Sequence, residues 1–119
     1  MKKFEFNMQK ILDLREFEEK QAQLELGKAV ARETEIQKTL EMIAQQRLNT
    51  MTSSEDIDDI NQLYKMNTYL LLLEQRKEHL LQELTQAKLV TEEKREEMKQ
   101  AMMKVKALEK LKEARFEEW

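Results

Sequence analysis

The stretch that decides the fold is residues 63–112, which read LYKMNTYLLLLEQRKEHLLQELTQAKLVTEEKREEMKQAMMKVKALEKLK. Apolar side chains recur in it at alternating steps of three and four residues, which is the spacing of a coiled-coil seam. Eleven of the fifteen positions on this line are apolar, and the line predicts one long helix with a second helix packed along it. The positions are Leu63, Met66, Leu70, Leu73, Lys77, Leu80, Leu84, Ala87, Thr91, Lys94, Met98, Ala101, Val105, Leu108 and Lys112.

One break in the chain is expected, at residues 49–56, which read NTMTSSED. With one Gly and no Pro in 119 residues, the chain has few other places for a turn. Thr52 and Glu55 have the spacing of a capping box, and acidic residues follow where a helix dipole favours them. The sequence therefore predicts a helix over about 7–48, a turn over about 49–53 and a helix over about 54–118.

A short connection between two helices favours antiparallel neighbours. We therefore expect an all-α fold, a long antiparallel two-helix coiled-coil hairpin with unequal arms, forming a single domain over 1–119. The first helix is less regular, because Arg15, Glu18, Glu19 and Glu33 interrupt its apolar side and leave a slip of one turn open. The apolar residues assigned to that side are Met8, Ile11, Ala22, Leu26, Ala29, Ile36, Leu40 and Ile43.

Closing the hairpin near residue 52 places Met8 opposite a residue near 96, so the rest of the second helix is expected to overhang. An apolar stripe without an intramolecular partner indicates an external one. The overhang holds Met98, Ala101, Met102, Met103, Val105, Leu108, Leu111, Phe116 and Trp119.

The composition argues against several functional classes. The chain has no Cys and one His, so a thiolate site, a disulfide framework and a multi-histidine zinc site are excluded. Gly27 stands alone without a phosphate loop, and the carboxylate pairs are typical of a solvated helix face. We expect no enzyme, no catalytic residue, no metal and no cofactor. The net charge of −3 gives no reason to expect nucleic acid, and no apolar window is long enough for membrane insertion.

Two surfaces are candidates for partner binding. Ile57, Tyr64 and Leu71 recur every seven residues and form a second apolar line on the second helix, with further residues along its edge. This line is either buried, because the first helix covers it or because the seam is broad, or exposed as a docking stripe, and the sequence leaves both interpretations open. His79 is either a surface polar residue or a partner contact. The stripe comprises Tyr64, Tyr69, Leu71, Leu72, Arg76 and His79.

The second surface is the end where the chain termini meet in an antiparallel hairpin. Apolar, aromatic and arginine side chains cluster in both terminal segments, and free tips are usually polar, so this end is expected to bind a partner. The tip comprises Phe4, Phe6, Met8, Ile11, Leu12, Arg15, Leu108, Leu111, Arg115, Phe116 and Trp119.

The opening residues 4–16, FEFNMQKILDLRE, resemble the start of the FliJ family of flagellar export proteins, which begins with an aromatic pair and continues to a Leu-Arg-Glu. Residues 18–26, EEKQAQLEL, continue the likeness, and residues 107–113, ALEKLKE, resemble a late segment of the family.

The resemblance implies a soluble, cytoplasmic component of the type III export apparatus at the flagellar base, peripheral to the cell membrane. It implies a stalk like the gamma subunit of rotary ATPases, with its termini in the pore of the export ATPase hexamer. The export gate, a membrane protein, and the export chaperones are the other implied partners.

Two alternatives remain from the residues alone. The first is a homodimeric coiled-coil scaffold without an ATPase partner, which would use the overhanging seam for self-association. The second is a chaperone that binds disordered cargo through methionines such as Met98, Met102 and Met103. A mass measurement separates the scaffold from the stalk, because the scaffold is expected to be a tight dimer.

Overall fold

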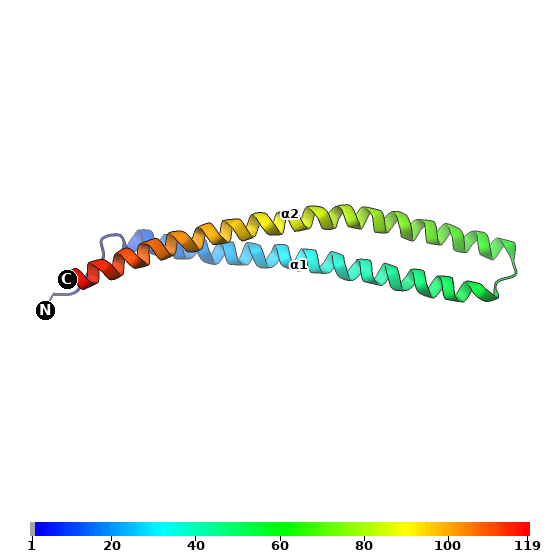
Figure 1. Ribbon diagram of the computed structural model, residues 1–119, viewed down its shortest axis with the longest axis horizontal. Helices are drawn as coiled ribbons and strands as arrows, with labels where there is room; N and C mark the ends of the chain where they lie inside the picture. Colours follow the sequence, from blue (N-terminus) through cyan, green and yellow to red (C-terminus); the bar gives the residue numbers. More distant parts are fainter. Residues whose placement is uncertain (1) are drawn as a thin grey trace. The chain divides into compact units, whose positions relative to one another are not determined.

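The computed structural model describes residues 2–119 and consists of two long helices (Figure 1). Helix α1 (Gln9–Ser53) has 45 residues and helix α2 (Ile60–Glu118) has 59. A 3-10 turn, η1 (Ser54–Asp56), lies between them, and no strand occurs among the described residues. The helices run antiparallel, so the predicted all-α hairpin with unequal arms is confirmed.

The contacts divide the chain into two compact units. One unit, residues 31–89, holds the connection and the parts of α1 and α2 next to it. The other unit consists of residues 2–30 and 90–119 and contains both ends of the described chain.

The seam predicted for α2 is found at every position. All fifteen of its residues are buried or half-buried, including the polar Thr91, and most of the other α2 side chains are exposed. The seam of α1 differs by one residue from the prediction at its start. Leu12 is 2% exposed, whereas Ile11 is 44% exposed and lies outside the seam.

Charged side chains take regular places in the α1 seam. Counting from Met8 in steps of four and three gives Leu12, Arg15, Glu19 and Ala22, and all of these are buried or half-buried. Long charged side chains can cover apolar surface with their methylene groups while their charges reach water. Arg15 and Glu19, which were expected to interrupt the pattern, are therefore members of it, whereas Glu18 lies outside this line.

The turn lies later than the predicted 49–53. Thr50, Thr52 and Ser53 donate their hydroxyl hydrogens to carbonyl oxygens four residues earlier, at distances of 2.8–2.9 Å, and so remain part of α1. The capping box of Thr52 and Glu55 is thus wrong, because Thr52 bonds back to Leu48.

The second helix begins at Ile60 and is capped by Asp59 instead. One carboxylate oxygen of Asp59 accepts a hydrogen bond from the backbone N–H of Asn61 at 2.9 Å. The backbone oxygen of Asp59 accepts the first helical bond, from Leu63, at 3.0 Å. An aspartate at this position satisfies a free N–H and favours the positive end of the helix dipole.

The later turn also removes the predicted overhang. Leu12 clusters with Val105, so the pairing is centred between Asp58 and Asp59 and not near residue 52. In an antiparallel hairpin, shifting the centre by a given number of residues shifts the partner of each residue by twice that number. The residues expected to overhang therefore gain partners in the N-terminal part of the chain. Val105, Leu108 and Leu111 therefore pack inside the molecule, against Phe6 and Leu12.

In the unit of residues 31–89, a thin core is bordered by ion pairs between the helices. The core side chains are Ile36, Ile43, Leu73 and Ala87. Arg32 lies 3.5 Å from Glu83, and Arg47 lies 3.2 Å from Glu74. These side chains are more than a third exposed, and such pairs contribute only about 0.2–1 kcal/mol each. Packing therefore stabilises this unit more than its charges do.

Candidate functional site

The terminal end is built on a small buried core. Phe6, Leu12 and Val105 form a cluster of buried side chains, and Phe4, Met8, Leu108 and Leu111 pack against it. The segment before α1 turns at Asn7 and Met8, where the N–H of Gln9 bonds the oxygen of Phe6 at 3.0 Å. The segment before α1 thus lies beside the end of α2 (Figure 1), and its Phe4 and Phe6 pack with Val105, Leu108 and Leu111.

Three aromatic rings lie on the outer side of this core. Phe4 meets Phe116 edge to face, with centroids 5.2 Å apart, and lies 6.1 Å from the ring of Trp119. Phe116 and Trp119 stack at 6.1 Å. Phe116 remains 55% exposed and Trp119 62% exposed, so these rings offer apolar area that the chain itself leaves uncovered.

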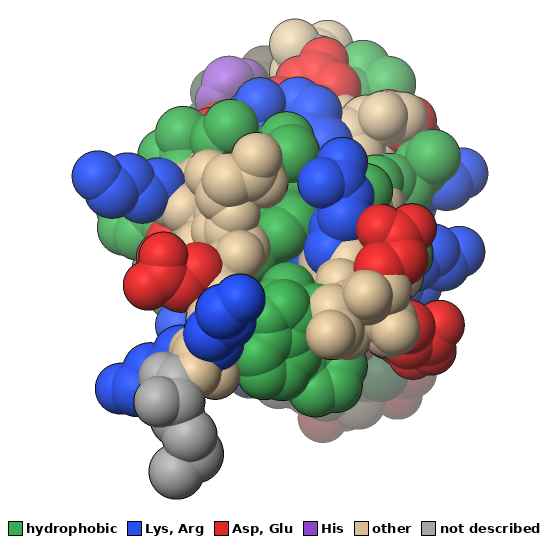
Figure 2. Space-filling view, turned by 90° about the vertical axis from the view of Figure 1, so that its left-hand side faces the viewer, with side chains coloured by type: hydrophobic (Ala, Val, Ile, Leu, Met, Phe, Trp, Pro, Cys, Tyr) green, Lys and Arg blue, Asp and Glu red, His purple; other side chains and the backbone are tan. Residues whose placement is uncertain are grey.

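Figure 2 shows the molecule from this end. Hydrophobic side chains lie near the centre of the view and also toward its edges, and Lys, Arg, Asp and Glu side chains lie between and around them. Apolar and charged groups are thus mixed on this face.

The structure brings eight of the eleven predicted tip residues together through the buried cluster and the ring contacts, and exposure divides all eleven into two groups. Those that build the end are the buried Phe6 and Leu12 and the partly buried Phe4, Met8, Arg15, Leu108 and Leu111. Those that are free to contact another molecule are the exposed Ile11, Arg115, Phe116 and Trp119. Within the first group, Arg15 donates to both carboxylate oxygens of Glu18, at 3.0 and 3.2 Å.

Val105 is a member of the buried core that the tip prediction missed. Its heptad position was visible in the sequence, but the misplaced turn assigned it to an overhang. The correct register would have paired it with Leu12.

The lateral stripe of α2 lies in the unit of residues 31–89. Tyr64 is 73% exposed, and Tyr69, Leu71 and Leu72 are exposed as well. Of the two open interpretations, coverage by α1 is therefore wrong for these side chains. Arg76 and His79 are also exposed, and His79 Nε2 lies 3.2 Å from Glu83 Oε1, one helical turn away.

A groove between the helices in the same unit was not predicted. Its apolar walls come from α1 and α2, and a charged cluster borders it. Glu74 contacts both Arg47 and Lys77 there, at 3.2 and 3.8 Å. The walls are Leu40, Ile43, Ala44, Leu48, Met51, Leu73 and Leu81. Some of these residues are buried in the seam and others are exposed, so no single sequence pattern groups them. The groove becomes visible only when the pairing of α1 with α2 is known.

The described residues hold neither a metal cluster nor a membrane span. Within residues 2–119, no three or more His, Cys, Asp or Glu side chains are grouped as a metal ion would require. No helix in this range has the length and apolarity needed to cross a membrane.

Comparison with protein families matches residues 4–119 to the family described as "Flagellar FliJ protein". No curated protein and no solved structure matches the chain. The match covers nearly all of the sequence, including the aromatic opening and both helices. The chain therefore belongs to the flagellar FliJ family and is a component of the flagellar export apparatus.

Proposed function

We propose that this chain is a non-enzymatic stalk of the export ATPase, with its terminal end seated in the pore of the ATPase hexamer. In this role it promotes assembly and turnover of the ring. It also links the ring to the export gate and to the export chaperones. The proposal combines the family assignment with the properties of the terminal end.

One observation carries the proposal. Phe116 and Trp119 are stacked and more than half exposed, and Phe4 holds them on a buried core. Large aromatic side chains that stay exposed on a rigid support are favoured anchors in protein interfaces. Their place beside both chain ends suits insertion of that end into a ring.

The mechanism follows from symmetry. A pair of helices presents different residues on each side, so it cannot contact all subunits of a symmetric hexamer in the same way. A contact that is stronger in one subunit state shifts that subunit toward the state. The stalk thereby biases which subunits hold or release nucleotide.

The Tyr64–His79 stripe is the proposed surface for the export gate. Its exposed Tyr64, Leu71 and Leu72 supply apolar contacts, and Arg76 and His79 supply polar ones. Binding to the cytoplasmic part of the gate protein should weaken in L72S and stay unchanged in L89S, because Leu89 is exposed outside the stripe.

The ATPase proposal is tested by mixing the full chain with the flagellar export ATPase from the same source. ATP hydrolysis and the mass of the assembly are recorded together. We expect stimulation and a ring that carries one copy of the chain. The double variant F116A/W119A should bind at least about tenfold more weakly, a loss of roughly 1.4 kcal/mol. The control M103A removes an exposed apolar side chain of α2 elsewhere and should behave as the wild type.

Unaltered ATPase binding by F116A/W119A would remove the terminal end from the interface. Phe6 is not a suitable target for this test, because it is 8% exposed and belongs to the core. Replacing Phe4 and Phe6 together would mix loss of binding with loss of packing.

The structure removes the main reason for proposing a homodimeric scaffold. It relied on an overhanging seam, and Val105, Leu108 and Leu111 pack inside the molecule instead. A tight dimer that does not bind or stimulate the ATPase in the same mass experiment would restore it.

A further inference from the structure

The end of the hairpin where α1 is joined to α2 carries charge of one sign only. Between Arg47 and Lys65 the chain has four charged residues, and all four are acidic. All four are also exposed. We refer to them as the acidic connection, and they are Glu55, Asp56, Asp58 and Asp59.

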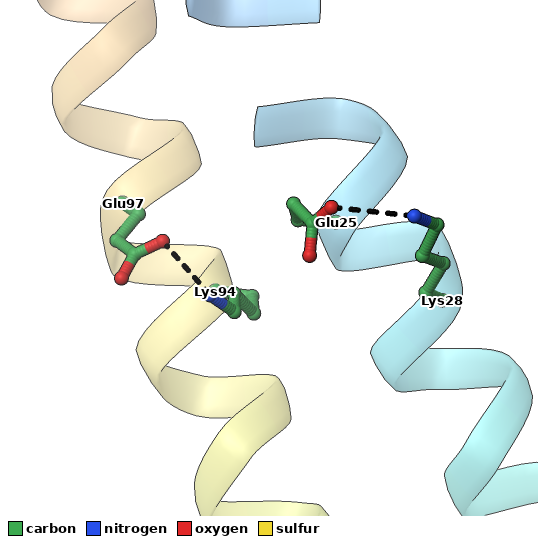
Figure 3. Close-up of polar contacts among 4 residues, drawn as sticks. All are labelled: Glu25, Lys28, Lys94 and Glu97. Carbon is green, nitrogen blue, oxygen red and sulfur yellow. Dashed lines mark hydrogen bonds and ion pairs between the residues drawn. The ribbon is translucent and has the colours of Figure 1, made fainter. Parts of the chain in front are cut away.

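The acidic connection has no cationic partner. Elsewhere on the two helices charges are matched by neighbours, as Lys28 is by Glu25 and Lys94 by Glu97, both at 3.4 Å (Figure 3). None of the four acids of the connection forms an ion pair within residues 2–119. The end of α1 and the start of α2 have opposite dipoles, which largely cancel and leave the sign of the local field to the acids.

The apolar groove of the same unit approaches this connection. Its lining includes Leu48 and Met51 of α1 and Leu81 of α2, and it holds about 360 Å³ of free space. All three side chains are exposed, Leu48 by 58%. Apolar side chains of another molecule can therefore enter between the two helices.

The groove side of α2 continues to the start of that helix. Steps of three and four residues keep to one side of a helix, and such steps lead from Leu81 through Glu74 to Ile60. Because Leu81 and Glu74 line the groove, Ile60 lies on the groove side, and it is 78% exposed directly after Asp59. The full row is Leu81, Glu78, Glu74, Leu71, Asn67, Tyr64 and Ile60.

The cations of the groove are balanced within the molecule. Arg47 and Lys77 both contact Glu74, at 3.2 and 3.8 Å. Two further acids lie on this side, Glu78 in the row of α2 and Glu41 seven residues before Leu48 on α1. The groove side therefore has an excess of acid, which is largest at the connection. The other cations of residues 41–88 are Lys65 and Arg76, which lie off the row, and Lys88, which lies at the end of the row away from the connection.

We propose that this groove face, made of Leu48, Met51, Ile60 and Leu81 and ended by the acidic connection, docks an amphipathic helix of a partner protein. The apolar residues of the partner helix recur at three- and four-residue spacing and enter the groove, and Lys or Arg residues at one of its ends lie over the connection. From Ile60 to Leu81 the face is about 32 Å long, which fits a helix of about 20 residues.

Charge selects this occupant over three others. A second copy of the chain would bring the same excess of acid and a net charge of −3, and like charges at close range are unfavourable. Nucleic acid and anionic lipid surfaces are negative as well, so the acidic connection repels both. The proposal does not rest on the stalk or on the gate contact. The groove face shares Tyr64 and Leu71 with the Tyr64–His79 stripe, so the variants below avoid that pair.

The test uses the full chain and two fluorescein-labelled synthetic helical peptides of about 20 residues. Both peptides carry Leu at three- and four-residue spacing, and they differ only at one end, where one has Lys and the other Glu. Fluorescence anisotropy gives each dissociation constant. We expect the Lys-ended peptide to bind at least about tenfold more tightly, and this preference to shrink as salt is raised.

One pair of variants locates the apolar contact. L48Q/I60Q replaces an exposed residue of each helix on the groove face and should weaken binding of the Lys-ended peptide by about tenfold or more. The matched control L72Q/L89Q replaces two exposed leucines of the same unit that lie off the row, and it should bind as the wild type does. Circular dichroism should show unchanged helicity in both.

A second pair of variants locates the charge. D56N/D58N should reduce the preference for the Lys-ended peptide about threefold or more, and Asp59 is left in place because it caps α2. E93Q/E96Q removes two exposed acids from the terminal unit and should keep the full preference. Since both variants change the net charge equally, the comparison separates the acidic connection from the charge of the whole chain.

Four outcomes would overturn the proposal. They are absence of binding by either peptide, equal binding of the two peptides, wild-type binding by L48Q/I60Q, and an equal loss of preference in D56N/D58N and E93Q/E96Q. A wild-type dimer that L48Q/I60Q converts to a monomer in sedimentation would instead assign the groove face to a second copy.

Discussion

Phe4 packs edge to face on Phe116, with ring centroids 5.2 Å apart and ring planes at 81°. This contact joins the segment that precedes α1 to the end of α2, and Trp119 lies against both rings. It holds the exposed rings of α2 in a fixed arrangement above the buried Phe6 and Leu12. The N-terminal segment is thus part of the surface proposed to enter the ATPase ring.

The Phe4–Phe116 contact should be measurable as a coupling. In a double-mutant cycle of F4A and F116A, the unfolding free energies should be non-additive by about 0.5–1.5 kcal/mol, the usual value for such aromatic pairs. Trp119 is the only tryptophan, so its fluorescence reports the same contact, and iodide quenching should increase in F4A. Quenching in F17A should match the wild type, because Phe17 has no ring contact among the described residues.

The register of α1 is tested by two neighbouring residues. L12A should lower the unfolding free energy by about 2–4 kcal/mol, because it leaves a cavity beside Phe6 and Val105. I11A should cost less than about 1 kcal/mol, since Ile11 is nearly half exposed. Urea denaturation of both variants gives the comparison, and a larger loss in I11A would contradict the register.

The start of α2 gives a third prediction. D59A should lower stability by about 1 kcal/mol, because Asp59 caps the N–H of Asn61. T52A should change it by less than about 0.5 kcal/mol, since Thr52 is exposed and only bonds back to the carbonyl of Leu48. Thermal melts with circular dichroism detection distinguish the two. If T52A were the more damaging change, the helix would begin at the earlier cap.

Replacing the single glycine should stabilise the chain. G27A should raise the unfolding free energy by about 0.5–1 kcal/mol, because alanine favours the helix and its Cβ meets no atom. The matched control is A31G, an exposed position of the same helix, which should lower it by a similar amount. A loss of stability in G27A would mean that the glycine has a structural role within the chain.

The fold class and the α2 seam were predictable because heptad spacing that persists over about seven heptads is typical of a coiled coil and of few other structures. The seam of α1 was less accessible. Arg15, Glu19 and Glu33 are half-buried at seam positions of α1. A hydrophobicity pattern assigns charged residues to the exposed side of a helix, so it does not identify these three as seam residues. Because charged residues interrupt the apolar line, the sequence does not show which of Ile11 and Leu12 faces α2. The prediction of Ile11 was wrong, and Leu12 is the buried residue.

The predicted position of the turn was wrong because small polar residues occur both at helix ends and within helices. Thr50, Thr52 and Ser53 can end a helix or bond back to its carbonyls, and the sequence does not distinguish these. The error then passed to every pairing across the hairpin and produced the overhang. Most of the tip residues still lie together, around Phe6 and Leu12 and in the ring contacts of Phe4, because both chain ends meet in any antiparallel hairpin. Their role in binding a partner stays a prediction.

The pairing of α1 with α2 also orders the steps by which the chain folds. Arg47 and Glu74 are 27 residues apart and can meet as soon as the connection forms, whereas Phe4 and Phe116 come from nearly opposite ends of the sequence. Closing the longer loop costs more chain entropy, so we expect the terminal unit to assemble after the unit of residues 31–89. During synthesis, Phe6 and Leu12 emerge long before Val105 and must wait for their partners. We therefore expect the aromatic end to be completed last, so that a formed Phe4–Phe116 contact would indicate a chain that has finished folding.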